Sequence, residues 1–248
     1  MKKIILLALL LGLTKVQAKE IYATFTVHAK QGASLAFNYS GIVNELHVDI
    51  MSVVKKGQIL ATLANDDLIA TNNASKVTLK YAKLDHERYK DLYKQNLIDK
   101  AMLDKYAMAH EAIVAKIALE NAIYEKTILR APFDGVISKR MIELGDVVSG
   151  QMIKTAFNLQ SEHARILVVE FDQKYNSDVK IGDTFLYQVD GDETQYEGKI
   201  YRIYPEANSD NRKIAVQVIA KDLKVGLFGE GKIITSDVNQ QSIKQRQE

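Results

Sequence analysis

The sequence predicts a mainly β fold that is interrupted by a long α-helical insertion. A short glycine-bounded motif occurs twice, at residues 41–58 and again at 135–151, and the residues between Gln58 and Ala131 include neither Gly nor Pro. Short β-branched runs between glycines are typical of strands and turns. One small β-domain is therefore predicted to be split by helices, which favours a spacer function over a catalytic one.

The two copies of the motif correspond position by position. Gly41-Ile42-Val43 aligns with Gly135-Val136-Ile137, and Val53 aligns with Val147. Each copy thus supplies the same order of strand and turn, and we expect the two copies to complete one β-structure together.

The chain opens with the pattern of an export signal. Lys2-Lys3 precedes an apolar run, Ile4–Leu13, and small or tolerated residues follow as far as Ala18. This run is too short to cross a membrane as a helix, which takes about 20 apolar residues. We expect residues 1–18 to be a signal peptide that sends the mature chain to the periplasm. The alternative is an uncleaved anchor.

Composition excludes several other classes. The chain has no Cys, which rules out a lipid-modified N-terminal cysteine, disulfides and thiolate metal sites. Its net charge of +2 gives no concentrated basic patch, so we expect no nucleic-acid partner.

The first residues of the mature chain are predicted to be strands. Apolar residues alternate from Ile21 to Val27, a turn is expected near Gly32, and a second strand is expected over Ser34–Tyr39. We assign residues 19–38, together with 162–236, to one small β-barrel.

Two helices are predicted next, one from Asp66 to Gln95 and one from Ala101 to Lys126. Asn65 is the expected N-cap of the first, with acidic residues in the first turn. Apolar residues recur at spacings of four and three in both helices, which predicts a contact seam. The predicted seam residues are Ala70, Ala74, Val77, Tyr81 and Leu84, and Met108, Ala112, Ala115, Leu119 and Ala122.

The two helices share a short connection, which predicts an antiparallel pair. Their apolar stripes are narrow and their other faces carry many charges, which favours a thin, solvated hairpin with coiled-coil packing. The alternative is that both helices fold into a compact core.

After residue 161 short strands recur with turn clusters between them, a pattern typical of a small barrel or sandwich. The predicted strands are Arg165–Phe171, Thr184–Val189, Tyr196–Ile203, Lys213–Ala220 and Gly231–Thr235. The polar tail, 237–248, is expected to be disordered.

These features resemble the periplasmic adaptor proteins of tripartite efflux pumps, the HlyD-like membrane fusion proteins. The most specific piece is Arg130–Ile137 followed by Gly145–Gln151, which looks like the second half of a lipoyl-like domain. The resemblance implies a split lipoyl-like domain over 39–65 and 127–161, a long antiparallel α-hairpin over 66–126, and an elongated molecule.

The resemblance also implies a function. Such adaptors bridge an inner-membrane transporter and a TolC-like outer-membrane channel, assemble as a ring of about six copies, and serve export such as multidrug resistance. It implies a transporter of the proton-driven RND type, with the ATP-driven ABC type as an alternative, and leaves the exported substrate open. Because the long insertion replaces the hairpin that carries a modifiable Lys in lipoyl domains, no cofactor is expected.

The family has a channel-docking signature near the hairpin tip. By resemblance Arg88 and Leu92 occupy its first two positions, and Asp99 occupies the third, where Ser is usual. Asp99 can also cap the second helix. Residue types alone favour a solvated Arg88 and a hairpin-core Leu92, and their placement at the tip of the hairpin reverses that preference. The family's further membrane-proximal domain after the barrel is expected to be absent, because few residues follow Thr235.

No catalytic constellation with suitable spacing occurs in the sequence, so we predict that the chain is not an enzyme. His86 and His110 are equidistant from the predicted tip and could face each other, but further ligands are not evident and we predict no metal site. The alternative function is a stand-alone periplasmic protein that binds a small molecule or a metal.

Overall fold

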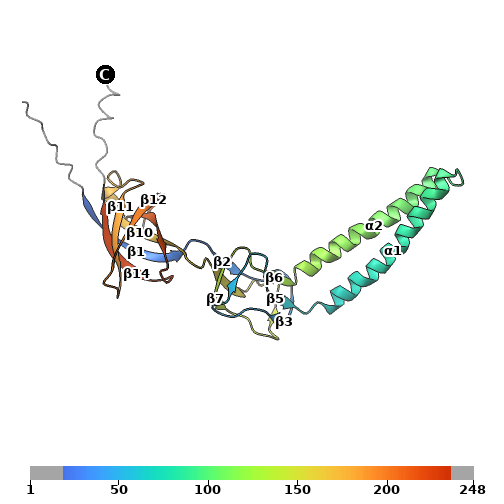
Figure 1. Cartoon of the computed structure of the whole chain (residues 1–248), viewed down its shortest axis with the longest axis horizontal. Helices are drawn as coiled ribbons and strands as arrows, with labels where there is room; N and C mark the ends of the chain where they lie inside the picture. Colours follow the sequence, from blue (N-terminus) through green and yellow to red (C-terminus); the bar gives the residue numbers. More distant parts are fainter. Residues whose placement is uncertain (1–18, 236–248) are drawn as a thin grey trace, which may run out of the picture. The chain divides into compact units, whose positions relative to one another are not determined.

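The computed structural model describes residues 19–235 (Figure 1). The predicted signal peptide and the predicted disordered tail lie outside the described residues. The chain forms two compact units, one made of residues 31–162 and the other of the described residues before and after them.

The second of these units is a closed antiparallel barrel. Its strands follow one another in the order β1-β10-β13-β12-β11-β14. They are β1 (Glu20–Ala29), β10 (Ala164–Asp172), β11 (Thr184–Val189), β12 (Gln195–Asn208), β13 (Lys213–Lys221) and β14 (Phe228–Ile234), with a 3₁₀ turn, η1 (Gln173–Tyr175), after β10. The strands predicted after residue 161 therefore all correspond to strands of this barrel, and only Thr235 lies beyond the end of β14.

Aromatic rings fill the barrel core. Phe25 meets Phe185 and Tyr187 edge to face, with ring centroids 5.8 and 5.2 Å apart. Two glycines of β14 make room for these rings, because a Cβ at Gly229 or Gly231 would lie within 2.9 Å of Phe25 or Phe185. The alternating apolar residues of β1, from Ile21 to Val27, are the ones whose side chains point into this core.

The other unit contains two small sheets, β2-β9-β7-β4 and β6-β5-β3-β8. Their strands are β2 (Gly32–Leu35), β3 (Gly41–Leu46), β4 (Val53–Val54), β5 (Ile59–Leu63), β6 (Ile128–Arg130), β7 (Gly135–Arg140), β8 (Val147–Val148) and β9 (Phe157–Gln160). A separate core fills this unit, with Leu60, Ile137, Phe157 and Leu159 fully buried.

The two copies of the repeated motif exchange strands. Ile42 of β3 pairs with Val147 of β8, and Val136 of β7 pairs with Val53 of β4. The longer strand of each copy is therefore completed by the short strand of the other, and neither copy can form these ladders alone.

The correspondence extends to backbone conformation. Met51 and Gly145 occupy equivalent positions and both have positive φ, 70° and 86°. Their N–H groups make equivalent bonds, Met51 to the carbonyl of Ile137 at 2.8 Å and Gly145 to that of Val43 at 2.9 Å. Residues other than glycine are uncommon at positive φ. Met51 therefore adopts the same turn conformation as Gly145 although it carries a side chain.

Residues 31–38 differ from their predicted place in the barrel. Gly32–Leu35 forms β2, which pairs with β9 of the other unit, and Phe37 is buried in that unit's core. Periodicity identifies a strand but not its partner. The chain leaves the barrel at the turn after Ala29, so the strand predicted over Ser34–Tyr39 does not belong to the barrel.

The residues between β5 and β6 form α1 (Asp66–Lys94) and α2 (Lys100–Glu125). They run antiparallel, because Asn72 donates to Asn121 at 2.9 Å near one end and Tyr106 donates to Tyr89 at 2.9 Å nearer the other. None of the helices in residues 19–235 combines the length and apolar composition needed to cross a membrane.

The predicted contact seam is wrong by two residues in each helix. Val77 and Tyr81 are 58% and 60% exposed, and Met108 and Leu119 are 68% and 62% exposed. The side chains that face the partner helix are instead buried or half-buried, and again recur at spacings of four and three. They are Leu68, Asn72, Ser75, Leu79, Ala82, His86 and Tyr89 of α1, and Leu103, Tyr106, His110, Ile113, Ile117 and Glu120 of α2.

Polar residues explain why this seam was missed. Asn72 and Ser75 are the buried residues of α1, and each bonds across to α2, Ser75 donating to Glu120 at 2.9 Å. Buried polar groups that find partners cost little. In α1 the buried stripe therefore contains polar residues, which apolar periodicity alone does not identify.

Asn65 occupies the expected N-cap position, but its side chain makes no cap hydrogen bond. Its amide instead donates to the hydroxyl of Thr127 at 3.1 Å. Thr127 is fully buried and follows α2. This bond therefore ties the beginning of the first helix to the end of the second.

We expect Gly135→Ala to destabilise the two-sheet unit by about 1–3 kcal/mol, the usual cost of overpacking. A Cβ at Gly135 would lie 2.3 Å from the carbonyl oxygen of Gln160, which belongs to the neighbouring strand β9. Gly32→Ala is the matched control in the same sheet, since the nearest atom is 3.9 Å away. Urea unfolding measures both, and equal stability of the two variants would contradict this reasoning.

Candidate functional site

The turn between α1 and α2 is closed by backbone hydrogen bonds. Asn96 adopts a left-handed conformation with φ 57°. Its N–H bonds to the carbonyl of Tyr93 at 2.9 Å, and the N–H of Leu97 bonds to that of Leu92 at 3.0 Å. This pair of bonds is the Schellman motif, in which Asn is the usual substitute for Gly. The turn therefore has a defined backbone.

Asp99 begins α2. Its backbone is extended, and its Oδ1 accepts a hydrogen bond from the N–H of Met102 at 2.8 Å. This is the geometry of a helix N-cap. The carboxylate of Asp99, at the third signature position, is therefore hydrogen-bonded to the first turn of α2.

Arg88 and Leu92 both lie on the last two turns of α1. The Arg88 side chain is 66% exposed and its Nη1 lies 3.0 Å from the Asp85 carboxylate on the same helix. Leu92 is half-buried. Arg88 also continues the exposed stripe of Tyr81 and Leu84 by helical spacing. Leu92 contacts the loop between the helices, because its carbonyl accepts the hydrogen bond from the N–H of Leu97. Arg88 lies about one helical turn further from this loop.

Leu97 is the residue at this turn that the sequence analysis missed. It follows Asn96 and its side chain is 65% exposed. An exposed Leu in a backbone-defined turn is a candidate contact residue, since apolar groups on a rigid turn bind at low entropic cost. The sequence signal for this turn is Asn96 directly after the helical pattern, because Asn often ends a helix in the left-handed conformation, and Leu97 follows it.

Two tyrosines brace the helices next to the turn. The rings of Tyr89 and Tyr106 stack with centroids 3.6 Å apart, and their hydroxyls are hydrogen-bonded at 2.9 Å. This bond with Tyr106 raises the pKa of Tyr89. The pair holds α1 against α2 close to the candidate site.

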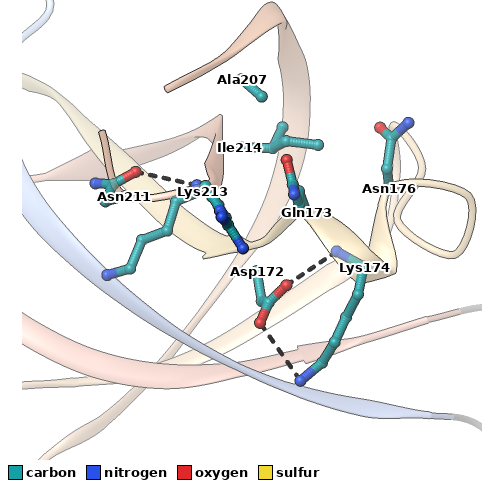
Figure 2. Close-up of a pocket in the computed structure, with 9 residues that line it drawn as sticks. Asp172, Gln173, Lys174, Asn176, Ala207, Asn211, Lys213 and Ile214 are labelled. Carbon is teal, nitrogen blue, oxygen red and sulfur yellow. Dashed lines mark hydrogen bonds and ion pairs between the residues drawn. The ribbon is translucent and has the colours of Figure 1, made fainter. Parts of the chain in front are cut away.

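A hollow of about 650 Å³ lies on the barrel unit (Figure 2). Three cations line it, Lys174, Arg212 and Lys213, but two of them face carboxylates. Asp172 lies 3.4 Å from the Lys174 ammonium, and Glu170 lies 3.7 Å from that of Lys213. The Lys174 backbone N–H, at 2.9 Å, lowers the pKa of Asp172. Because these charges are largely balanced within the protein, the hollow gives no ground for assigning a ligand.

The family model that matches this chain is the CzcB-like barrel-sandwich hybrid domain, over residues 31–158. An uncharacterized protein of Haemophilus influenzae is 26% identical over 207 residues, 79% of this chain and 51% of the relative. The cobalt-zinc-cadmium resistance protein CzcB of Cupriavidus metallidurans is 29% identical over 163 residues, 58% of this chain and 30% of the relative. The chain thus spans about half or less of the length of these relatives.

Solved structures share the fold. A MacA–MexA chimeric protein that contains the Pseudomonas aeruginosa MexA α-hairpin domain matches with a TM-score of 0.83 at 20% identity, over 90% of this chain and 81% of that one. MacA from Actinobacillus actinomycetemcomitans matches with a TM-score of 0.64 at 20% identity, over 90% of this chain and 80% of that one.

Proposed function

Because this chain belongs to the membrane fusion protein family of periplasmic adaptors, with a CzcB-like barrel-sandwich hybrid domain, we propose that it is the adaptor of an export pump. In this proposal it resides in the periplasm and bridges an inner-membrane transporter and a TolC-like outer-membrane channel. Members of this family are adaptors rather than enzymes, so its role is to join and seal.

The helix pair carries this proposal. Along its whole length, Lys100–Glu125, α2 has no fully buried residue, and α1 buries only Asn72 and Ser75, both against α2. The main packing partner of each helix is the other one. This favours a hairpin arm with coiled-coil packing over helices that serve a compact core. At 1.5 Å per residue, an arm of α1's length reaches roughly 40 Å.

We place the channel contact at the turn of this arm. Its proposed residues are Arg88, Leu92 and the turn residue Leu97, with Asp99 fixing the turn through its cap. Leu97 offers exposed apolar surface. Arg88 offers an exposed cation, and Arg is a residue type that is enriched among the residues that dominate binding at protein interfaces.

Site-specific photocrosslinking in intact cells tests this proposal. A photoreactive residue at position 97 is expected to capture an outer-membrane channel, whereas the same residue at Asn73, exposed on α1 far from the turn, is expected not to. If position 97 captures no channel while the protein is folded and abundant, docking through the turn is wrong. The stand-alone binding protein then becomes the better explanation.

We further propose that the arm associates with other copies of this chain. The exposed stripes that were predicted as the seam, Val77 and Tyr81 of α1 and Met108 and Leu119 of α2, leave apolar surface on the outside of the helix pair. Packing against a neighbouring copy in a ring would cover it. The number of copies, about six by family resemblance, is part of this proposal.

Tyr81→Glu is expected to reduce covalent dimers and larger species at least severalfold when cells are treated with an amine-reactive crosslinker. The reason is that it places a charge within an apolar contact. Thr71→Glu adds the same charge to the same helix at an exposed position, roughly 80–120° around the helix axis from Tyr81 and Val77, and should leave the pattern of crosslinked species unchanged. Thermal stability should not move in either variant, because Glu is a good helix former at exposed positions. If Tyr81→Glu forms the same amounts of covalent dimers and larger species as the unchanged protein, this contact is wrong.

A further inference from the structure

The two histidines of the helix pair face each other. The rings of His86 on α1 and His110 on α2 have centroids 5.6 Å apart and planes inclined by 37°. Both side chains are half-buried. Within residues 19–235 neither imidazole makes a hydrogen bond or an ion pair, whereas His47 and His163 lie 3.1 and 3.0 Å from carboxylates.

The separation of the rings suits a shared metal ion. Imidazole nitrogens bind Zn²⁺ at about 2.0–2.1 Å. Two imidazoles on one tetrahedral ion therefore place their ring centroids roughly 5–6 Å apart. Half-burial leaves one side of the pair open to water, which can complete the coordination. No group of three or more His, Cys, Asp or Glu in the described part of the chain could hold a metal, so a site here has two protein ligands.

The surroundings hold the two rings in place. One helical turn nearer the loop, Tyr89 and Tyr106 stack and hydrogen-bond across the helices. Neighbours that fix the backbones of both ligands reduce the entropy that is lost on binding. The histidines are also far apart in sequence, so a shared ion closes a long loop and adds a cross-link between α1 and α2.

We propose that His86 and His110 form a cross-helix site for a divalent first-row transition metal ion, such as Zn²⁺, with water as the remaining ligands. Imidazole is a preferred ligand for zinc, copper and nickel. The ion stiffens the arm near its turn by linking the two helices. This inference does not depend on the identity of the proposed pump partners.

Zinc binding by the untagged mature protein tests the proposal, measured by competition with a chromogenic chelator. We expect about one Zn²⁺ per chain. His86→Gln and His110→Gln should each weaken binding by roughly tenfold or more, since even ligand-supporting residues are worth 10–100-fold. The double variant should be no weaker than either single variant, because either change already removes the bridge. His163→Gln, in the barrel unit, is the matched control and should bind as the unchanged protein does.

A second measurement reads the cross-link itself. Zinc should raise the midpoint of thermal unfolding by a few degrees in the unchanged protein and in His163→Gln, but in neither helix variant. Circular dichroism without metal checks that the variants keep their helices. If the unchanged protein binds no zinc at about 100 μM, or if both helix variants bind and respond as it does, the proposed site is wrong.

Discussion

Arg88→Asp is expected to abolish export in living cells while the protein remains folded and abundant. Arg88 offers an exposed cation on the last turns of α1, and the substitution replaces it with a charge of the opposite sign at the proposed channel contact. Like-charge juxtaposition at an interface costs several kcal/mol, whereas within the helix the new Asp meets Asp85 at a cost of a few tenths. The loss should therefore appear in function and not in folding.

Growth inhibition measures this effect. The panel should include drugs, dyes, bile salts, and cobalt, zinc and cadmium salts, since the relative CzcB is named for resistance to those metals. The assay uses the compounds that inhibit a deletion strain more strongly than the parent strain. A strain that carries Arg88→Asp should be as sensitive to them as the deletion strain. Lys80→Asp makes the same charge change at an exposed position further from the turn and should retain resistance. Full resistance with a stable Arg88→Asp protein would remove Arg88 from the docking surface.

Phe157→Ala is expected to cost about 3–5 kcal/mol and to unfold the two-sheet unit first. Phe157 is the fully buried first residue of β9, in a core that also contains Ile137 and Leu159. Since single domains are stable by only about 5–15 kcal/mol, this loss removes much of the unit's margin.

Phe185→Ala is the matched change in the barrel, where Phe185 is equally buried in a separate core. Hydrogen exchange resolved along the sequence should show each variant weakening protection mainly within its own unit. Loss of protection spread equally over both units for either variant would contradict the separation of the two cores.

The repeated motif was the most reliable guide to the fold. Glycine spacing and β-branched runs aligned Gly41-Ile42-Val43 with Gly135-Val136-Ile137. In the structure these residues begin β3 and β7, which have equivalent partners. Pairing itself could not be predicted, because alternation describes one strand's faces and not its neighbour. For the same reason β2 was assigned to the barrel although it pairs with β9.

The helices show a different limit. Their bounds followed from capping residues and from the absence of Gly and Pro, but their contact faces did not follow from apolar periodicity. Two stripes with the same spacing were available, and the buried one contains Asn72 and Ser75. A polar residue can occupy a helix seam when its partner lies opposite, as Asn121 does for Asn72, and such residues help to set the register.

The candidate site was predictable only through resemblance. Arg88 and Leu92 have no chemical signature of their own, whereas Asp99 could be expected to cap a helix and does so. Leu97 was missed because an exposed apolar residue is recognised only when its exposure is known.

The place of the helix pair between two paired strands has a consequence for how the chain assembles. β5 and β6 are hydrogen-bonded neighbours, with Ile59 opposite Arg130, so both helices together form the loop of a β-hairpin. During synthesis or export, the side chains of Leu60 and Leu63 in the first motif copy stay exposed to water until the second copy packs against them. Because α1 and α2 pack mainly against each other, we expect the helix pair to form before the second copy is in place. In the folded chain the N–H of Leu63 donates to the carbonyl of Thr127 at 2.9 Å. The arm is thus also the element that shortens the search of one half of the core for the other.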